Sequence, residues 1–338
     1  MGTGHVMRCL ALAQAWQDSG GQAVFAMSAP SPSMSERLLS EGMEVIRVHA
    51  QAGSSDDAQG VAELAKRRAA AWIVVDGYHF GADYQQELKA AQLQIFFVDD
   101  NAHAGHYAAD LVLNPNSNAE DNLYQSREPH TRLLLGLRYV PLRREFEPWR
   151  DWKREIPRLG RKILITMGGT DPDNITLQAI EALLHAGIEG VEATVVVGAG
   201  NPHVDSLQRV ISGAGGVIRL RRNATDMPDL MAWADMAMIA AGGTLWEMLF
   251  MGSSVMSFAR DPVQGAIVSG LARDGVVTDL GPPRSLNPAA LGAAIMELAR
   301  SRQSRSRMSA LGRERVDGRG AGRVCELLIS HEIRDLTK

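Results

Sequence analysis

The chain begins with MGTGHVMRCLALAQAW, residues 1–16, in which a glycine-rich turn leads directly into an amphipathic helix. Such a turn normally follows a buried strand, because it carries the chain from a parallel sheet to the start of a helix. Only Met1 precedes the turn in this sequence. We therefore expect the natural protein to begin about 10–20 residues earlier, enough for one strand and its loop. The alternative is an initial methionine that simply precedes a loop.

Composition narrows the class of protein. The 338 residues are 45% hydrophobic, which is enough for two domains with separate cores. A net charge of −4 without a basic stripe argues against a nucleic-acid partner. No apolar run reaches the roughly 18 residues of a membrane span, and no signal peptide is evident. Two distant cysteines, Cys9 and Cys325, suit a reducing compartment. We expect a cytoplasmic protein with no membrane partner.

Apolar strand-like runs alternate with helix-like segments along most of the chain. In the first half the predicted strands cover residues 23–28, 43–49, 72–78, 95–100 and 111–116, and a second series starts with KILITM at 162–167. Apolar strands separated by helices indicate parallel sheets covered on both faces. The pattern predicts an α/β protein with two doubly wound, Rossmann-like domains, at 1–140 and 161–338. A charged linker at 141–160 joins them, and a ligand cleft lies between them.

The first glycine turn carries a candidate catalytic group. Gly2 and Gly4 permit the close approach of an anion to the start of the helix, and His5 follows them at once. An imidazole is the side chain best suited to take a proton from water at neutral pH. The alternative is a capping turn with a solvated histidine.

A second glycine turn, MGGTDPDN at 167–174, follows the first strand of the second domain. Gly168, Gly169 and Thr170 can donate hydrogen bonds to a phosphate, while Asp171 or Asn174 can cap the next helix. The alternative is an ordinary capped turn without a ligand.

The third turn, AAGGTLWEM at 240–248, joins a strand to a helix through Gly242, Gly243 and Thr244. Glu247, one turn into that helix, can accept the hydroxyls of a ribose while the helix start holds phosphates. The alternative is a glutamate that complements the helix dipole. Neither turn is a Walker loop or a dinucleotide fingerprint, but together they predict a nucleotide site.

Two strand ends add polar groups to the first domain. VVDGYHF at 74–80 supplies Asp76 and Tyr78, and FVDDNAH at 97–103 supplies Asp99 and Asp100. These side chains can position a sugar or orient His5, although strand-end Asp and Tyr also serve turns. The histidines lack the spacing of metal ligands, so no metal site is predicted.

In this order the motifs resemble the bacterial UDP-sugar hydrolases of pseudaminic acid biosynthesis, which release UDP from UDP-2,4-diacetamido-2,4,6-trideoxy-β-L-altropyranose. That family is similar in fold to the two-domain (GT-B) glycosyltransferases, including the N-acetylglucosaminyltransferase that forms lipid II. The resemblance rests on GTGHVMRCLALA (2–13), DGY (76–78), VDD (98–100), DLVLNPN (110–116), LGLRYVPLRREF (135–146), MGGTDPDN (167–174) and GGTLWE (242–247). Two features depart from the family: the strand and acidic-serine loop before the first turn are absent, and Val263 stands before Gln264 where relatives often carry asparagine.

The resemblance implies a metal-independent, inverting hydrolysis with cleavage of the C–O bond at the anomeric carbon. It implies that His5 is the general base and that Tyr78 and Asp100 complete the catalytic group. The implied substrate-binding residues are Gly4, Arg8, Gly168, Gly169, Thr170, Asn174, Met227, Gly242, Gly243, Thr244, Glu247 and Gln264. Among them Glu247 binds the ribose, and the loop around Met227 binds uracil.

The resemblance implies a UDP-sugar as the partner and no cofactor, and we expect a monomer. Because related folds carry out different reactions, two alternatives stay open. One is a GT-B glycosyltransferase that uses a nucleotide-sugar. The other is a UDP-sugar-binding protein without catalytic activity.

Overall fold

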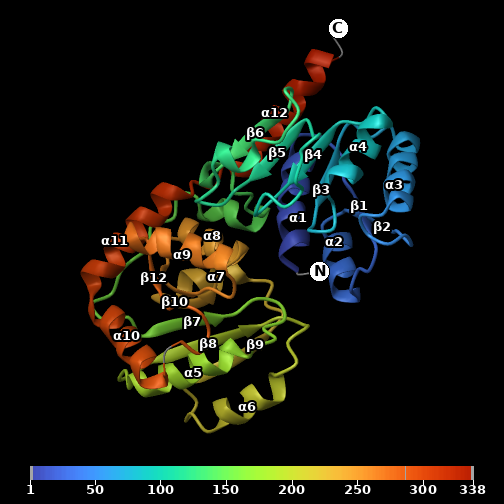
Figure 1. Cartoon of the computed structure of the whole chain (residues 1–338). Helices are drawn as coiled ribbons and strands as arrows, with labels where there is room; N and C mark the ends of the chain where they lie inside the picture. The colour runs from blue at the N-terminus through green and yellow to red at the C-terminus, as the bar shows by residue number, and fades with distance from the viewer. Residues whose placement is uncertain (1–2, 286, 336–338) are drawn as a thin grey trace. The chain divides into compact units, whose positions relative to one another are not determined.

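The chain folds into two α/β units, which a computed structural model describes over residues 3–285 and 287–335. Unit 1 contains Thr3–Arg144 and the segment that begins at Arg319, whereas unit 2 contains Glu145–Gly318 (Figure 1). All paired strands within the named sheets are parallel. The prediction of two Rossmann-like units with parallel sheets is confirmed.

The sheet of unit 1 is divided into two parts. One part pairs β1 (Val24–Met27) with β2 (Glu44–Arg47), and the other has the order β3-β4-β5-β6. The strands of the second part are β3 (Ile73–Asp76), β4 (Ile95–Val98), β5 (Leu111–Asn114) and β6 (Arg132–Leu135). The first five strands match the predicted runs, while β6 was not predicted. Its sequence, RLLL, is too short and too uniform to show a strand period.

Helices of unit 1 follow the strands in the expected alternation. They are α1 (Thr3–Asp18), α2 (Pro32–Ser40), α3 (Ser55–Arg67) and α4 (Ala82–Ala90), with short 3₁₀ turns η1 (Asp121–Tyr124) and η2 (Leu137–Tyr139). The helix α1 buries two sides: Val6 and Leu10 join one apolar cluster, and Leu12 joins another with β4 and β5. This packing leaves the face with His5 and Arg8 directed toward the strand ends.

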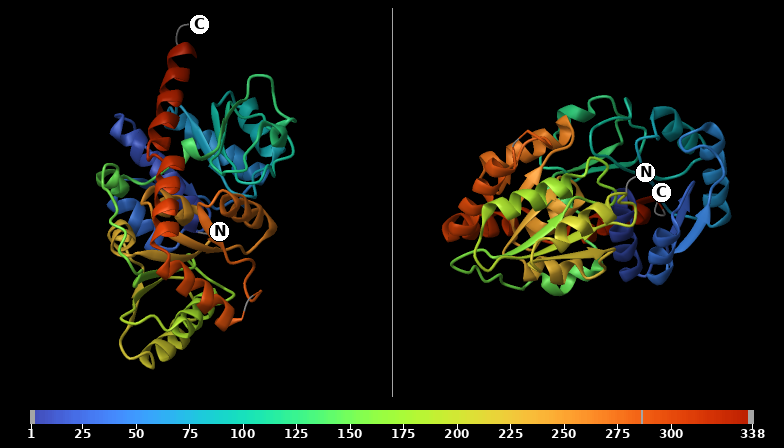
Figure 2. Two further views of the ribbon diagram at one scale, coloured as in Figure 1. Left: turned by 90° about the vertical axis from the view of Figure 1, so that its left-hand side faces the viewer. Right: turned by 90° about the horizontal axis from the view of Figure 1, so that it is seen from below.

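The last helix, α12 (Gly320–Asp335), returns to unit 1. Its residues Val324 and Leu328 join Leu12 and Phe96 in one apolar cluster, and Figure 2 shows α12 in red beside the blue and teal elements of unit 1. The predicted boundaries placed this helix in the second domain, at 161–338, and a linker at 141–160. The structure instead divides the chain after Arg144, within the 3₁₀ turn η3 (Arg144–Trp149), because α12 buries its apolar face on α1.

Unit 2 has one continuous sheet of six strands in the order β12-β11-β10-β7-β8-β9. The strands are β7 (Lys162–Thr166), β8 (Glu192–Val197), β9 (Ile218–Arg222), β10 (Met236–Ala240), β11 (Ser254–Phe258) and β12 (Val277–Asp279). The strand order reverses at β7, which lies between β8 and β10. In doubly wound sheets this reversal marks where ligands bind, at the carboxyl ends of the strands.

The helices of unit 2 cover this sheet and enclose a large apolar core. They are α5 (Ile175–Ala186), α6 (Val204–Ser212), α7 (Met227–Trp233), α8 (Gly243–Phe250), α9 (Pro262–Arg273), α10 (Pro288–Arg300) and α11 (Arg302–Arg315). Completely buried residues such as Ile163, Ile165 and Met236 connect β7 and β10 in this core. Within residues 3–285 and 287–335, no helix combines the length and the apolar character needed to cross a bilayer.

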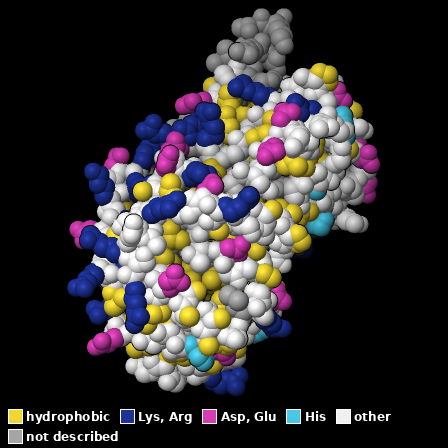
Figure 3. All heavy atoms as spheres, turned by 60° about the vertical axis from the view of Figure 1, so that its left-hand side comes forward, with side chains coloured by type: hydrophobic (Ala, Val, Ile, Leu, Met, Phe, Trp, Pro, Cys, Tyr) yellow, Lys and Arg dark blue, Asp and Glu magenta, His cyan; other side chains and the backbone are white. Residues whose placement is uncertain are grey.

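The helix α11 is rich in arginine, but much of that charge is used internally. Arg305 is buried and donates to main-chain carbonyls, Arg313 donates to the carbonyl of Phe250, and Arg315 pairs with Asp274 at 2.8 Å. Figure 3 shows Lys and Arg side chains, with Asp and Glu among them, on the side of the molecule where α10 and α11 lie. The surface there carries both signs of charge.

Candidate active site

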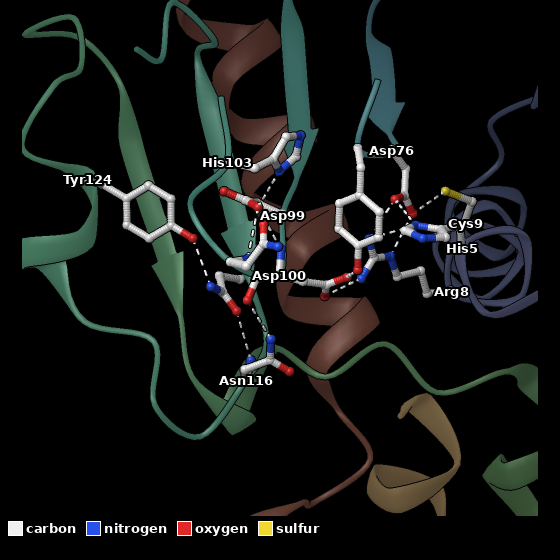
Figure 4. Close-up of polar contacts among 12 residues, drawn as sticks. His5, Arg8, Cys9, Asp76, Asp99, Asp100, His103, Asn116 and Tyr124 are labelled. Carbon is white, nitrogen blue, oxygen red and sulfur yellow. Dashed lines mark hydrogen bonds and ion pairs between the residues drawn. The ribbon is translucent and has the colours of Figure 1, made fainter. Parts of the chain in front are cut away.

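Side chains from α1 meet the carboxyl ends of β3 and β4 in unit 1 (Figure 4). His5, Arg8 and Cys9 lie three and four residues apart, so they share one face of the helix α1. Asp76 is the last residue of β3, and Asp100 follows the end of β4. Because neighbouring parallel strands end at the same edge of the sheet, both carboxylates reach this face of the helix.

His5 and Asp76 form a hydrogen-bonded pair. The Nδ1 atom of His5 lies 2.7 Å from Oδ1 of Asp76, whose side chain is only 4% exposed. An ionised carboxylate only accepts hydrogen bonds, so Nδ1 must carry the proton that it donates. A neutral imidazole in this tautomer has its lone pair on Nε2. The pair therefore has the orientation required of a general base.

Arg8 connects the two carboxylates. Its Nε donates to Oδ2 of Asp76 at 2.6 Å, its Nη2 donates to Oδ1 of Asp76 at 2.5 Å, and its Nη1 binds Asp100. Arg8 Nη2 also lies 3.0 Å from Nδ1 of His5, but both atoms are donors once the tautomer is assigned. Burial alone would lower the pKa of Arg8, yet the two carboxylates raise it well above its ordinary value.

Asp76 accepts from four donors, because Cys9 Sγ also lies 3.2 Å from its Oδ2. Burial by itself would raise the pKa of Asp76, but the hydrogen bonds from Arg8 and His5 outweigh burial and lower it. Asp76 is thus a fixed negative charge that can stabilise a protonated His5. The same burial, with Asp76 beside it, raises the pKa of the Cys9 thiol, so Cys9 is a poor nucleophile.

Tyr78 lies on the solvent-exposed side of this network and contacts both Asp100 and His5. Its hydroxyl donates to Oδ2 of Asp100 at 3.0 Å, and its ring meets the ring of His5 edge-on, with centroids 5.0 Å apart. Desolvation and the Asp100 carboxylate raise the pKa of Tyr78 above its ordinary value. Tyr78 is 55% exposed, so its ring is available to a ligand that approaches His5.

The structure thus brings together four of the predicted residues: His5, Arg8, Tyr78 and Asp100. Sequence reasoning did not distinguish Asp76 from the other strand-end acids as the partner of His5, although the DGY motif contained it. The helix α1 begins at Thr3, so Gly4 lies in its first turn, where a β-carbon would meet no atom within 4 Å. Gly2 lies outside the described residues.

The predicted residues of unit 2 form a second group at the ends of β7 and β10. Gly168 has φ +86°, and a β-carbon on Gly198, after β8, would lie 2.4 Å from the carbonyl oxygen of Gly169, so the loop after β8 packs closely against the turn at 168–170. Asp171 caps α5, because its carboxylate accepts from the amides of Ile175 and Thr176 at 2.9 Å each. Asp171 therefore provides the cap that the sequence left open between Asp171 and Asn174.

The start of α8 is capped differently from α5. Its N-cap residue is Gly242, which has no side chain. The first main-chain amides of α8 therefore receive no hydrogen bond from a capping side chain. Glu247 is half-buried in the second turn of this helix. Since β10 pairs directly with β7, the turns at 168–170 and 242–244 follow neighbouring strands.

Two other predicted residues lie at helix starts in unit 2. Met227 is the first residue of α7. Gln264 accepts the amide of Arg260 at 3.1 Å with its Oε1 and donates its own amide to Asp261 at 2.9 Å, so it belongs to the cap of α9. Binding of a ligand by Thr170, Asn174, Met227 or Gln264 stays a prediction. Within the described part of the chain, no group of three or more His, Cys, Asp or Glu side chains could hold a metal ion.

No family model matches the chain. An uncharacterized protein of Methanocaldococcus jannaschii is 24% identical over 78% of this chain, and the chain spans about half (54%) of that relative's length. The spore coat polysaccharide biosynthesis protein SpsG of Bacillus subtilis is 24% identical over 69% of this chain and 68% of its own length.

Solved structures share the fold over almost the whole chain. MurG of Acinetobacter baumannii has a TM-score of 0.66 with 17% identity, covering 97% of this chain and 96% of its own. HepE of Anabaena, determined in complex with UDP-glucose, has a TM-score of 0.62 with 16% identity and the same coverage. These likenesses show the fold, and they confirm the predicted GT-B-like pair of Rossmann-like domains.

Proposed function

We propose that the protein displaces UDP from a UDP-sugar with inversion at the anomeric carbon, using water as the nucleophile and His5 as the general base. The single observation that carries this proposal is the hydrogen bond between His5 Nδ1 and the buried Asp76, which leaves Nε2 free to take a proton. The resemblance to the UDP-sugar hydrolases supports the reaction. The complex of HepE with UDP-glucose supports the class of ligand.

The reaction balances with the groups present. The oxygen of a water molecule forms a bond to the anomeric carbon while one water proton moves to Nε2 of His5. The bond between that carbon and the phosphate oxygen breaks, and UDP leaves with the electron pair. Asp76 stabilises the imidazolium that forms. A general base contributes about 10²–10⁴-fold, so stabilisation of the leaving diphosphate must supply much of the rest.

Unit 2 is proposed to hold the UDP. The main-chain amides of the turns at 168–170 and 242–244 would bind the diphosphate, in the way that helix starts bind anions without a metal. Glu247 would accept the ribose hydroxyls, and the segment around Met227 would contact uracil. Tyr78, exposed beside His5, would contact the sugar or the attacking water.

The second candidate function is a glycosyltransferase, in which a hydroxyl of an acceptor replaces water. It is favoured by the comparisons, since MurG and HepE share the fold and SpsG is a polysaccharide biosynthesis protein. The same His5–Asp76 pair would deprotonate the acceptor. The third alternative is a UDP-sugar-binding protein without turnover. In such a protein the hydrogen-bonded pair of His5 and Asp76 would have no catalytic role.

One assay separates these functions. The protein is incubated with UDP-2,4-diacetamido-2,4,6-trideoxy-β-L-altropyranose and with UDP-N-acetylhexosamines in H₂¹⁸O, without an acceptor and in the presence of EDTA. We expect equal amounts of UDP and free sugar, with the ¹⁸O in the sugar. Label in the UDP would contradict C–O cleavage, and a requirement for Mg²⁺ would contradict the metal-independent mechanism. UDP release only after an acceptor is added would establish transfer, and binding without release would establish a binding protein.

A further inference from the structure

A second histidine–carboxylate pair lies next to the candidate active site. Asp99 follows β4, its side chain is 0% exposed, and its Oδ1 lies 3.1 Å from Nδ1 of His103. The hydroxyl of Tyr107 and the amides of Asp100 and Asn101 also donate to Asp99. Burial alone would raise the pKa of Asp99, but the donors His103 and Tyr107 lower it. Asp99 is therefore an ionised carboxylate in the interior of unit 1.

His103 contacts the same tyrosine that His5 contacts. The rings of His103 and Tyr78 meet edge-on with centroids 5.5 Å apart, and those of His5 and Tyr78 meet in the same way at 5.0 Å. Each imidazole is hydrogen-bonded to a carboxylate at the end of one of two neighbouring strands: Asp76 is the last residue of β3, and Asp99 directly follows β4 (Figure 4). Tyr78 thus contacts two anchored histidines.

The other nitrogen of His103 is enclosed within unit 1. Nε2 of His103 is buried and makes no hydrogen bond of normal geometry within the described residues. The hydrogen bond to Asp99 raises the pKa of His103, burial opposes this, and the carbonyls of Gly77 and Phe80 favour the charged form further. A charged His103 carries an N–H on Nε2 as well as on Nδ1, whereas a neutral His103 that donates to Asp99 from Nδ1 leaves the buried Nε2 without a proton.

We propose that His103 is a positioning residue for Tyr78: in its charged form, anchored on Asp99, it holds the Gly77–Phe80 turn so that Tyr78 stays packed against His5. The groups that face His103 are the Asp99 carboxylate, the Tyr78 ring and the apolar ring of Phe97. Tyr107 acts on it through Asp99, and Asp100 acts through the Tyr78 hydroxyl. The effect on turnover rests on the proposed function, but the effect on Tyr78 does not.

The arrangement has a defined dependence on pH. His5 must lack a proton on Nε2 to act as a base, whereas His103 must carry one to hold the turn. Because the pKa of His103 is raised, the turn is held below that pKa and released as the pH rises through it. Turnover should therefore show a bell-shaped pH profile with its alkaline limb set by His103. Tyr78 does not supply that limb, since its pKa is raised above the ordinary value of a tyrosine.

The test uses the full chain with isotope-labelled histidine and tyrosine rings, observed by NMR from about pH 5 to 9, a range that brackets ordinary histidine titration. In the unaltered protein the Tyr78 and His5 ring signals should shift as His103 titrates. His103→Phe keeps a ring against Tyr78 and Phe97 but removes both nitrogens, so this coupled shift should disappear. His103→Gln, which keeps a donor for Asp99, should lose the shift as well and provides a folded variant if phenylalanine is not tolerated.

Turnover gives the second measurement. His103→Phe should lower kcat about 10- to 100-fold, the effect of a misplacement of about 1 Å, with KM little changed and the alkaline limb lost. His106→Phe is the matched control, because His106 lies on the same loop as His103 and also pairs with a carboxylate, that of Glu128 at 3.2 Å. This substitution should change neither the coupled shift nor turnover. Tyr78 and His5 signals that titrate identically with and without His103 would overturn the positioning role. Loss of the coupled shift in a protein that turns over no UDP-sugar would support the positioning role and refute the proposed function.

Discussion

The two units present their candidate groups in opposite ways. Unit 1 brings charged side chains from α1 and two strand ends into a network around the buried carboxylate of Asp76. Unit 2 offers main-chain turns at the ends of β7 and β10, with Asp171 already committed to the cap of α5. Proton transfer requires titratable side chains held in a defined orientation, whereas an anion can be bound by backbone amides alone. Changes of charge should therefore disturb unit 1 much more than unit 2.

The strands of the two units also differ in how completely they are buried. In unit 2 the strands β10 and β11 are buried along their whole length. In unit 1 the sheet is divided between β1 and β3, and Val24 and Val74 on these strands are 39% and 43% exposed. Apolar β-branched side chains that face solvent contribute little burial energy. The side-chain network of unit 1 thus lies at the end of a strand, β3, that is less completely buried than β10 and β11 of unit 2.

The largest expected effect concerns His5. His5→Asn should lower kcat by about 10²–10⁴-fold, because the substituted side chain cannot take the proton from the nucleophile. UDP affinity, measured by calorimetry, should stay nearly constant because unit 2 is proposed to bind the nucleotide. His79→Asn, at an exposed histidine on the same loop as Tyr78, is the matched control and should leave kcat unchanged. An unaffected kcat in the His5 variant would remove His5 from the reaction.

The second prediction compares one carboxylate from each unit. Asp76→Asn should destabilise unit 1 by about 3–5 kcal/mol, because Arg8 would keep a buried charge with a weakened partner. Asp171→Asn, at the cap of α5, should cost unit 2 only about 1 kcal/mol. Hydrogen exchange, measured in each unit as denaturant is added, gives the change in the free energy of unfolding for both variants. Equal losses would show that the network of unit 1 is no more dependent on charge than a helix cap.

The third prediction tests the nucleotide side. Glu247→Ala should weaken UDP binding by about 1.5–3 kcal/mol, the value of lost hydrogen bonds to a charged group. Glu181→Ala, at an exposed glutamate on α5, should leave the affinity unchanged. Calorimetry with UDP measures both. An affinity that does not respond to the loss of Glu247 would place the ribose elsewhere.

The smallest expected effect is a difference in acid stability between the units. The pKa values of Asp76 and Asp99 are lowered in the folded state, so their contribution is present above about pH 4, where unfolded aspartates are ionised, and is lost as the pH falls through the folded values. Asp57, whose pKa burial raises, acts with the opposite sign. In the described part of unit 2, the aspartate whose pKa is lowered is Asp226. Its ion pair with Arg221 is exposed, so solvent screens it and its contribution to stability is small.

Hydrogen exchange in each unit between about pH 3 and 6, corrected for intrinsic rates, should therefore show unit 1 losing protection first on acidification. Parallel loss of protection in both units would contradict the assignment of the pH-sensitive groups to unit 1.

Local patterns in the amino-acid sequence were enough to predict most of the helices and strands and most of the candidate residues. Alternating apolar runs and helix-like segments predict two parallel-sheet units, because strand and helix periods are properties of a few consecutive residues. The glycine turns at 168–170 and 242–244 are readable for the same reason, and so is His5 at the start of a helix. A four-residue strand such as β6 carries too little period to be found.

Which of these residues contact one another depends on tertiary packing. Asp76, rather than Asp99 or Asp100, became the partner of His5 because the packing of α1 against β3 brings residues 71 positions apart within 2.7 Å. The same kind of contact placed α12 in unit 1 and anchored His103 beside Tyr78. Such contacts depend on how whole elements bury their apolar faces, and the spacing of neighbouring residues does not record that choice.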